Sequence, residues 1–189
     1  MSLPRAFKSR PDRQKTMGPY LHPCRAKKEK FDKIFGPRVR PRVGLVLEGK
    51  PSHVHNHFRS VNAVDFIKVL PSGADYFLLQ KELSSQTKTF VSKRSDVKDL
   101  SDLLINFSDT AAACSKMDLI ITVDTAVAHL AGALGCRTSM LLHYQSDWRW
   151  GLETKTTHWY SNMRLIRLQR DCDWTNVYAE ITANIQSIL

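Results

Sequence analysis

The stretch MDLIITVDTAVAHLAGALG (117–135) joins a continuous apolar run to a segment that is rich in small residues. The run MDLIITV (117–123) predicts a buried strand. The segment TAVAHLAGALG (125–135) predicts a helix that ends at Gly135, a typical residue at the end of a helix. Asp124 lies where the strand meets the helix, so an acid, a hydroxyl and a histidine interrupt an otherwise apolar unit.

Strand and helix patterns alternate along the chain from residue 42 onward. The other predicted strands are RVGLVLE (42–48), ADYFLLQ (74–80), TFVSK (89–93), CRTSMLLHY (136–144) and MRLIRLQ (163–169), and predicted helices cover 60–70, 100–116 and 173–189. Continuous apolar strands that alternate with helices favour a parallel sheet covered on both faces. We therefore expect a Rossmann-like doubly wound α/β domain over 43–189, with ligands at the carboxyl ends of the strands.

The formal net charge of +10 comes from the first 42 residues. This segment holds 13 Lys/Arg and 3 Asp/Glu, whereas residues 43–189 hold 15 of each. A basic arm can bind phosphates or an anionic surface, but a solvated linker or domain-edge helix is the simpler interpretation. The neutral body argues against a nucleic-acid domain. We expect 1–42 to form a basic N-terminal segment with a short helix at about 23–35.

Composition excludes other classes. The 189 residues suffice for one domain with a proper core, and no run of 18 apolar residues predicts a membrane span. The N-terminal stretch MSLPRAFKSRPDRQK lacks the apolar core of a secretory signal. The four cysteines are widely spaced without a CxxC pair, which favours free thiols in a reducing compartment. We therefore expect a cytoplasmic protein.

The start of the helix at 125–135 has the properties of an anion site. Asp124 is expected at the N-cap, where its carboxylate accepts a backbone N–H of the first turn. The N–H groups of Thr125 and Ala126 would face the strand end, and free N–H donors with the positive end of the helix dipole bind anions. His129 follows four residues after Thr125 and can reach the same anion. Alternatively, Asp124 only caps the helix and His129 is a core histidine.

The segment EGKPSHVHNHFRS (48–60) follows the first predicted strand. Gly49 allows close backbone approach, and Lys50, Arg59 and Ser60 can donate hydrogen bonds to phosphate. The segment is neither a GxGxxG nor a Walker A loop, so the motif alone is weak evidence.

Three histidines in this segment, His53, His55 and His57, alternate along the sequence. In an extended strand they would share one face, as metal ligands can. An irregular loop is the simpler interpretation because no cysteine or acidic cluster accompanies them. No metal site is predicted.

The stretch FLLQKE (77–82) ends the second predicted strand. In doubly wound folds an acid or amide at this place often contacts a ribose hydroxyl. Gln80 or Glu82 could make that contact, and either could equally be an exposed loop residue.

A further loop, between about 145 and 162, concentrates aromatic residues: Trp148, Trp150, Trp159 and Tyr160. With Arg149 they could stack on a base or sugar. Packing of the loop against the edge of the domain is the favoured alternative.

Together these stretches resemble a known family. The run DLIITVDTAVAHLAGALG followed by SMLLHYQSDWRWGLE and WYSNMRLIRL is similar to glycosyltransferase family 9, the ADP-heptose:lipopolysaccharide heptosyltransferases. The branch attached to tetratricopeptide repeats is the most similar. RVGLVLEGKP, RSV, YFLLQKE and the Gly-Pro-Tyr-Leu of 18–21 also match it. The resemblance covers about 19–180, although Leu47-Glu48-Gly49 stands where the family usually has Trp-Ser-Gly.

The resemblance implies the C-terminal, nucleotide-sugar-binding half of a GT-B glycosyltransferase. It places Asp124, Thr125, Ala126, His129, Lys50, Arg59 and Ser60 around the donor diphosphate, and Gln80 or Glu82 near the nucleoside. Such enzymes transfer the sugar by displacement at its anomeric carbon, usually without a metal, so no cofactor is expected. The N-terminal half, which commonly carries the acceptor site and the catalytic base, has no counterpart in this sequence. We therefore expect a fragment or half of such an enzyme with an unknown acceptor, or a non-catalytic nucleotide- or partner-binding remnant.

Overall fold

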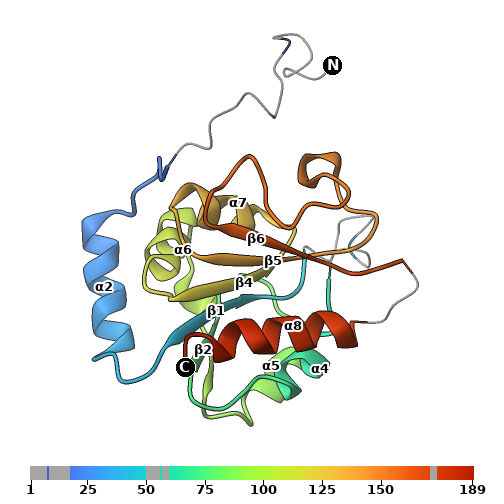
Figure 1. The fold of residues 1–189 in the computed structure, drawn as a ribbon. Coiled ribbons are helices and arrows are strands. Elements are labelled where there is room, and N and C mark those ends of the chain that lie inside the picture. Colours follow the sequence, from blue (N-terminus) through green and yellow to red (C-terminus); the bar gives the residue numbers. More distant parts are fainter. Residues whose placement is uncertain (1–7, 9–17, 50–55, 57–59, 171–173) are drawn as a thin grey trace.

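Six parallel strands form the central sheet of the computed structural model, which describes residues 8, 18–49, 56, 60–170 and 174–189 (Figure 1). Their order across the sheet is β3-β2-β1-β4-β5-β6. The strands are β1 (Arg42–Val46), β2 (Asp75–Leu78), β3 (Val97–Asp99), β4 (Leu119–Val123), β5 (Thr138–Leu142) and β6 (Met163–Arg167). This order is that of a doubly wound sheet, so the predicted Rossmann-like α/β fold is confirmed.

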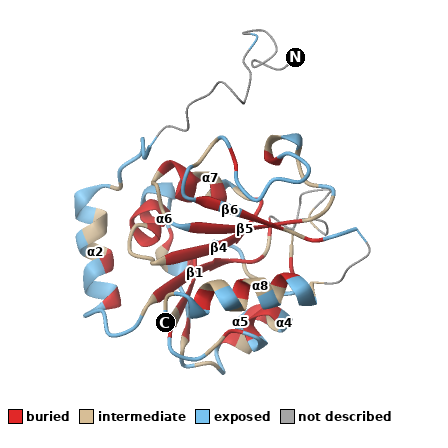
Figure 2. Ribbon diagram, viewed as in Figure 1, coloured by how far each residue is buried: buried red, intermediate tan, exposed pale blue. Residues whose placement is uncertain are grey.

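Helices cover both faces of the sheet. On one face lie α4 (Ala63–Lys68), α5 (Ser85–Val91) and α8 (Thr175–Gln186), and on the other α2 (Arg25–Phe35), α6 (Phe107–Cys114) and α7 (Ala126–Ala133). Successive residues of β1 point to opposite faces, so that Leu45 packs under α8 and α4 while Val46 packs under α6 and α7. All residues of β1, β4 and β5 are buried, as Figure 2 shows, which explains their continuous apolar runs.

The strand predicted at 89–93 is wrong, because these residues end helix α5 and continue into the turn after it. Ser84 caps this helix by accepting a hydrogen bond from the Thr87 N–H at 3.2 Å. Thr87 and Val91 are both buried and stand four residues apart, so they lie on one helical face. The strand of this region is β3, which the sequence pattern did not indicate because only Val97 of its three residues is buried.

Of the two helical stretches predicted within 100–116, LSDLLINF holds only a short 3-10 turn, η2 (Ser101–Leu103), whereas SDTAAACSK largely coincides with helix α6. The division occurs at Asn106, whose side chain accepts hydrogen bonds from the N–H groups of Ser108 and Asp109 at 3.0 and 3.2 Å. The Asp109 carboxylate in turn accepts from the Asn106 N–H at 3.2 Å. This capping box starts a new helix.

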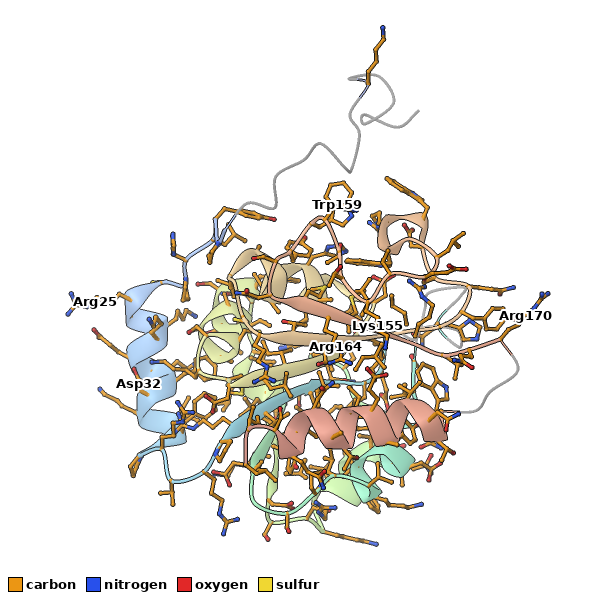
Figure 3. All side chains as sticks on the ribbon, in the orientation of Figure 1. Arg25, Asp32, Lys155, Trp159, Arg164 and Arg170 are labelled. Carbon is orange, nitrogen blue, oxygen red and sulfur yellow. The ribbon has the colours of Figure 1, made fainter. Side chains whose placement is uncertain are left out.

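The helix expected at about 23–35 is α2, and it carries part of the basic segment onto the domain. Phe31 and Phe35 are buried on it, and the rings of Phe35 and Phe77 lie 4.7 Å apart. Arg25 extends from its outer side into solvent (Figure 3). None of the helices in the described part of the chain combines the length and apolar character that crossing a membrane requires.

Candidate functional site

A cavity of about 320 Å³ opens at the carboxyl ends of β1, β2 and β4. The chain runs from β1 to β2 and β3 on one side and then crosses to β4 on the other side of β1, so the strand order reverses between β1 and β4, where the cavity lies. Ligands of doubly wound sheets bind at this place, and the volume is at the lower end of the usual range for ligand pockets. The described residues that line it are Val46, Glu48, Gly49, Asn56, Gln80, Lys81, Glu82, Phe107, Asp124, Thr125, Ala126 and Val127.

The first turn of α7 forms one wall of this cavity. The N-cap is Thr125, with extended backbone angles, and not Asp124 as expected. Asp124 is the residue before the N-cap, and it is buried at the end of β4 with 8% of its surface exposed. The Thr125 side chain makes no capping hydrogen bond to the helix; its hydroxyl lies 3.4 Å from that of Thr122. The Thr125 side chain therefore does not satisfy the N–H groups of the first turn, which borders the cavity.

Gln80 connects two of the loops that border the cavity. Its Oε1 accepts hydrogen bonds from the N–H groups of Leu47 and Glu48 at 2.7 and 3.2 Å, and its Nε2 donates to the Glu82 carbonyl at 2.9 Å. The side chain thereby ties the loop after β1 to the loop after β2. Glu82 itself is exposed at the rim.

Glu48 directs its carboxylate toward the start of α5. It accepts hydrogen bonds from the Thr87 hydroxyl at 2.7 Å and from the Ser84 N–H at 3.2 Å. These two hydrogen bonds partly offset the negative charge of the Glu48 carboxylate. Ser60, predicted near the diphosphate, accepts a hydrogen bond from the Gly49 N–H at 2.9 Å and is not among the described residues that line this cavity.

His129 lies one turn further along α7 and is not among the described residues that line the cavity. Its ring stacks on Trp150 with centroids 5.1 Å apart, and its Nδ1 lies 3.0 Å from the Tyr160 hydroxyl. Burial lowers the pKa of His129, and the Arg149 guanidinium lowers it further, while the Asp124 and Asp147 carboxylates oppose this. The imidazole is therefore mainly neutral at pH 7.

The aromatic loop that surrounds His129 packs mainly onto the domain. Trp150 of this loop is buried, and Trp159, labelled in Figure 3, donates its indole N–H to the Arg149 carbonyl at 2.9 Å. Tyr160 comes so close to α7 that a Cβ on Gly132 would lie 2.3 Å from its ring. The favoured interpretation of this loop, packing at the domain edge, holds for these residues.

Some predicted residues lie outside the part of the chain that the structure describes: Lys50, Arg59 and the three histidines of the loop after β1. Within the described ranges no group of three His, Cys, Asp or Glu side chains could hold a metal. Conversely, the cavity includes Lys81 and Phe107, which the sequence did not single out. In the sequence, Phe107 fits an apolar helical pattern, whereas its 57% exposure follows from tertiary packing.

The sheet order and the cavity at its reversal point define a doubly wound α/β domain. Neither the models of protein families nor the curated proteins yield a match to the chain. Among solved structures, the ADP-heptose lipopolysaccharide heptosyltransferase II of E. coli is similar over 90% of this chain and 54% of its own, with a TM-score of 0.61 and 17% identity.

Two further structures give the same result. The glycosyl transferase family 9 protein of Veillonella parvula matches over 91% of this chain and 47% of its own, with a TM-score of 0.58 and 14% identity. The E. coli heptosyltransferase WaaC with ADP matches over 85% and 48%, with a TM-score of 0.57 and 15% identity. The chain thus has the fold of these glycosyltransferases and spans about half of their length, as expected for one half of a GT-B protein.

Proposed function

We propose that this chain is the donor-binding domain of a glycosyltransferase and that the switch-point cavity holds the diphosphate and nucleoside of a nucleotide sugar. One observation carries the proposal. The cavity is bordered both by the first turn of α7 and by the loop after β2, which are the places predicted for the diphosphate and the nucleoside.

The diphosphate would lie against Thr125 and Ala126. A helix start attracts an anion through its free N–H donors and its dipole, and Ala126 is exposed and small enough to allow close approach. Lys81 at the rim would add a positive charge. The nucleoside would then extend toward Glu82, whose exposed carboxylate can accept a hydrogen bond from a ribose hydroxyl.

In transfer, an acceptor hydroxyl would attack the anomeric carbon of the sugar while the bond from that carbon to the diphosphate breaks. Negative charge then grows on the departing diphosphate oxygen. The dipole and N–H donors of α7 stabilise this charge without reorganisation, as in other preorganised anion sites. His129 faces Trp150 and Tyr160 and is not among the described lining residues, so no contact with the diphosphate is assigned to it. The acceptor and the base that deprotonates it would come from outside the described cavity.

Calorimetric titration with ADP, the nucleotide named with one of the similar structures, tests the binding site. We expect Ala126→Glu to weaken ADP binding by at least about 10-fold, because a carboxylate at the helix start repels the diphosphate. The fold should tolerate it, since an acid in the first turn favours a helix. Ala126→Gln, which adds equal bulk without the charge, is the matched control and should lose much less. Equal losses in both variants, or no ADP binding by the wild type, would contradict the proposal.

A second candidate is a binding module without transferase activity. Glu48 favours it, because this carboxylate lines the cavity and adds negative charge where a diphosphate would bind. Both candidates predict nucleotide binding, so turnover separates them. Release of ADP from an ADP-sugar in the presence of acceptor, measured with and without a separately supplied partner domain, identifies a transferase. Binding without ADP release in either mixture identifies the module.

A further inference from the structure

An exposed aromatic ring borders the cavity on the side of the loop after β2. Phe107 lines the cavity together with Lys81 and Glu82, and 57% of its surface is exposed. The other lining residues with apolar side chains are smaller: Val46, Ala126 and Val127. An apolar ring left in water at the edge of a polar cavity offers a face to a flat ligand. Every nucleobase has such a face, and stacking on an aromatic side chain contributes substantially to nucleotide binding.

The backbone of Phe107 is held on both sides by hydrogen bonds. It is the first residue of α6, between the two members of the capping box, Asn106 and Asp109. The Asn106 side chain accepts from the Asp109 N–H, and the Asp109 carboxylate accepts from the Asn106 N–H, each at 3.2 Å. The capping box therefore fixes the direction in which the ring leaves the helix start.

The basic N-terminal helix reinforces this arrangement. The Asp109 side chain is fully buried, and its Oδ1 lies 2.6 Å from Lys27 Nζ and 3.4 Å from Lys30 Nζ, both on α2. The capping function uses the other oxygen, Oδ2. The Asp109 carboxylate thus links Lys27 of α2 to Asn106, the N-cap of α6. A buried carboxylate needs such partners, and losing one disturbs the position of the group.

We propose that Phe107 is the stacking platform for the base of the bound nucleotide, and that α2, through Lys27 and Asp109, is the positioning element that aims it. The inference rests on the proposed function, because it places a nucleotide in the same cavity. It also assigns a role to the described part of the basic segment. Phe107 would contact the base directly, whereas Lys27 and Asp109 would act through the capping box.

Titrations with ADP and with inorganic pyrophosphate separate the base from the phosphates. Phe107→Ala should weaken ADP binding by roughly 5- to 100-fold and leave pyrophosphate binding unchanged. Phe107→Trp, which keeps an aromatic face, should retain ADP binding. Ile105→Ala is the matched control, because Ile105 is 66% exposed nearby but is not among the described lining residues.

Each result has a defined meaning. If the wild type binds ADP and Phe107→Ala binds it equally well, the platform is refuted while the proposed function stands. Equal loss of ADP and pyrophosphate in Phe107→Ala indicates a disturbed cavity and also refutes the platform. If the wild type binds neither ligand, the proposed function fails and the platform fails with it.

Lys27→Met tests the positioning role of α2, with Lys33→Met on the exposed side of the same helix as control. We expect Lys27→Met to weaken ADP binding about 3- to 10-fold with unchanged pyrophosphate binding, at a temperature where thermal unfolding shows both variants folded. Lys33→Met should match the wild type for both ligands. Unchanged ADP binding in Lys27→Met, or parallel loss of both ligands, overturns the positioning role.

Discussion

Gln80 should be a main support of the cavity, and its removal can be predicted in free energy. Only 5% of the surface of Gln80 is exposed. Its side chain accepts hydrogen bonds from the N–H groups of Leu47 and Glu48 and donates one to the Glu82 carbonyl. Gln80→Ala leaves the buried Leu47 N–H without its partner, which costs about 1–3 kcal/mol. The buried Cγ methylene group is also lost from packing, at about 0.8 kcal/mol. Water that enters from the cavity recovers part of this cost.

We therefore expect Gln80→Ala to lower the free energy of unfolding by about 2–4 kcal/mol, a large share of the stability of a typical domain. Urea unfolding followed by tryptophan fluorescence measures this change. Gln86→Ala is the matched control because Gln86 is exposed on α5, and it should change stability by less than about 0.5 kcal/mol. A loss below about 0.5 kcal/mol for Gln80→Ala would refute the supporting role and leave Gln80 free to serve the nucleoside alone.

Three further predictions concern stability and reactivity. Gly135→Ala should destabilise the fold by roughly 1 kcal/mol more than Gly36→Ala. Both glycines have positive φ, but of the two only Gly135 would place a Cβ against a neighbour, 2.3 Å from Pro19 Cγ. Equal losses of unfolding free energy in urea would contradict this prediction. Burial lowers the folded-state pKa of His129, so the unfolded chain binds more protons and stability should fall as the pH drops below about 6.5. His129→Gln should lose this component, whereas parallel pH profiles of unfolding free energy would exclude it. Burial raises the pKa of the Cys114 thiol. A thiol reagent followed by peptide mapping should therefore label exposed Cys24 before buried Cys114, and equal labelling rates for these two cysteines would contradict the burial of Cys114.

The strand-to-helix unit at 117–135 could be predicted from sequence because its signals agree. A fully buried strand has a continuous apolar run, and small residues with a terminal glycine indicate a packed helix. The structure places β4 at Leu119–Val123 and α7 at Ala126–Ala133. The N-cap was missed by one residue, because the strong preference of aspartate for this position is outweighed here by burial of Asp124 at the strand end.

The misses share a physical cause, which is dependence on distant residues. Edge strand β3 buries only Val97, so its three residues have no readable period. The hydrogen bonds from Gln80 to the loop after β1 join residues about 33 positions apart, and no local pattern indicates them. Likewise, an apolar residue such as Phe107 looks like core until the neighbouring elements leave it exposed beside a cavity.

The site itself was partly predictable. Asp124, Thr125 and Ala126 line the same cavity as Gln80 and Glu82, because the carboxyl ends of parallel strands meet at one edge of the sheet. His129 shares their helix but points into the aromatic cluster of Trp150 and Tyr160, whose distance in sequence hid the contact. Their roles in ligand binding stay predictions.

The most direct test of the switch-point site is a titration of the isotopically labelled chain with ADP, followed by two-dimensional ¹⁵N–¹H NMR. Binding of the diphosphate at the start of α7 predicts saturable shifts with one site per chain, largest at the backbone amides of Thr125, Ala126 and Val127. A titration that leaves these amides unmoved, whether ADP fails to bind or shifts only amides away from the cavity, would contradict the central claim.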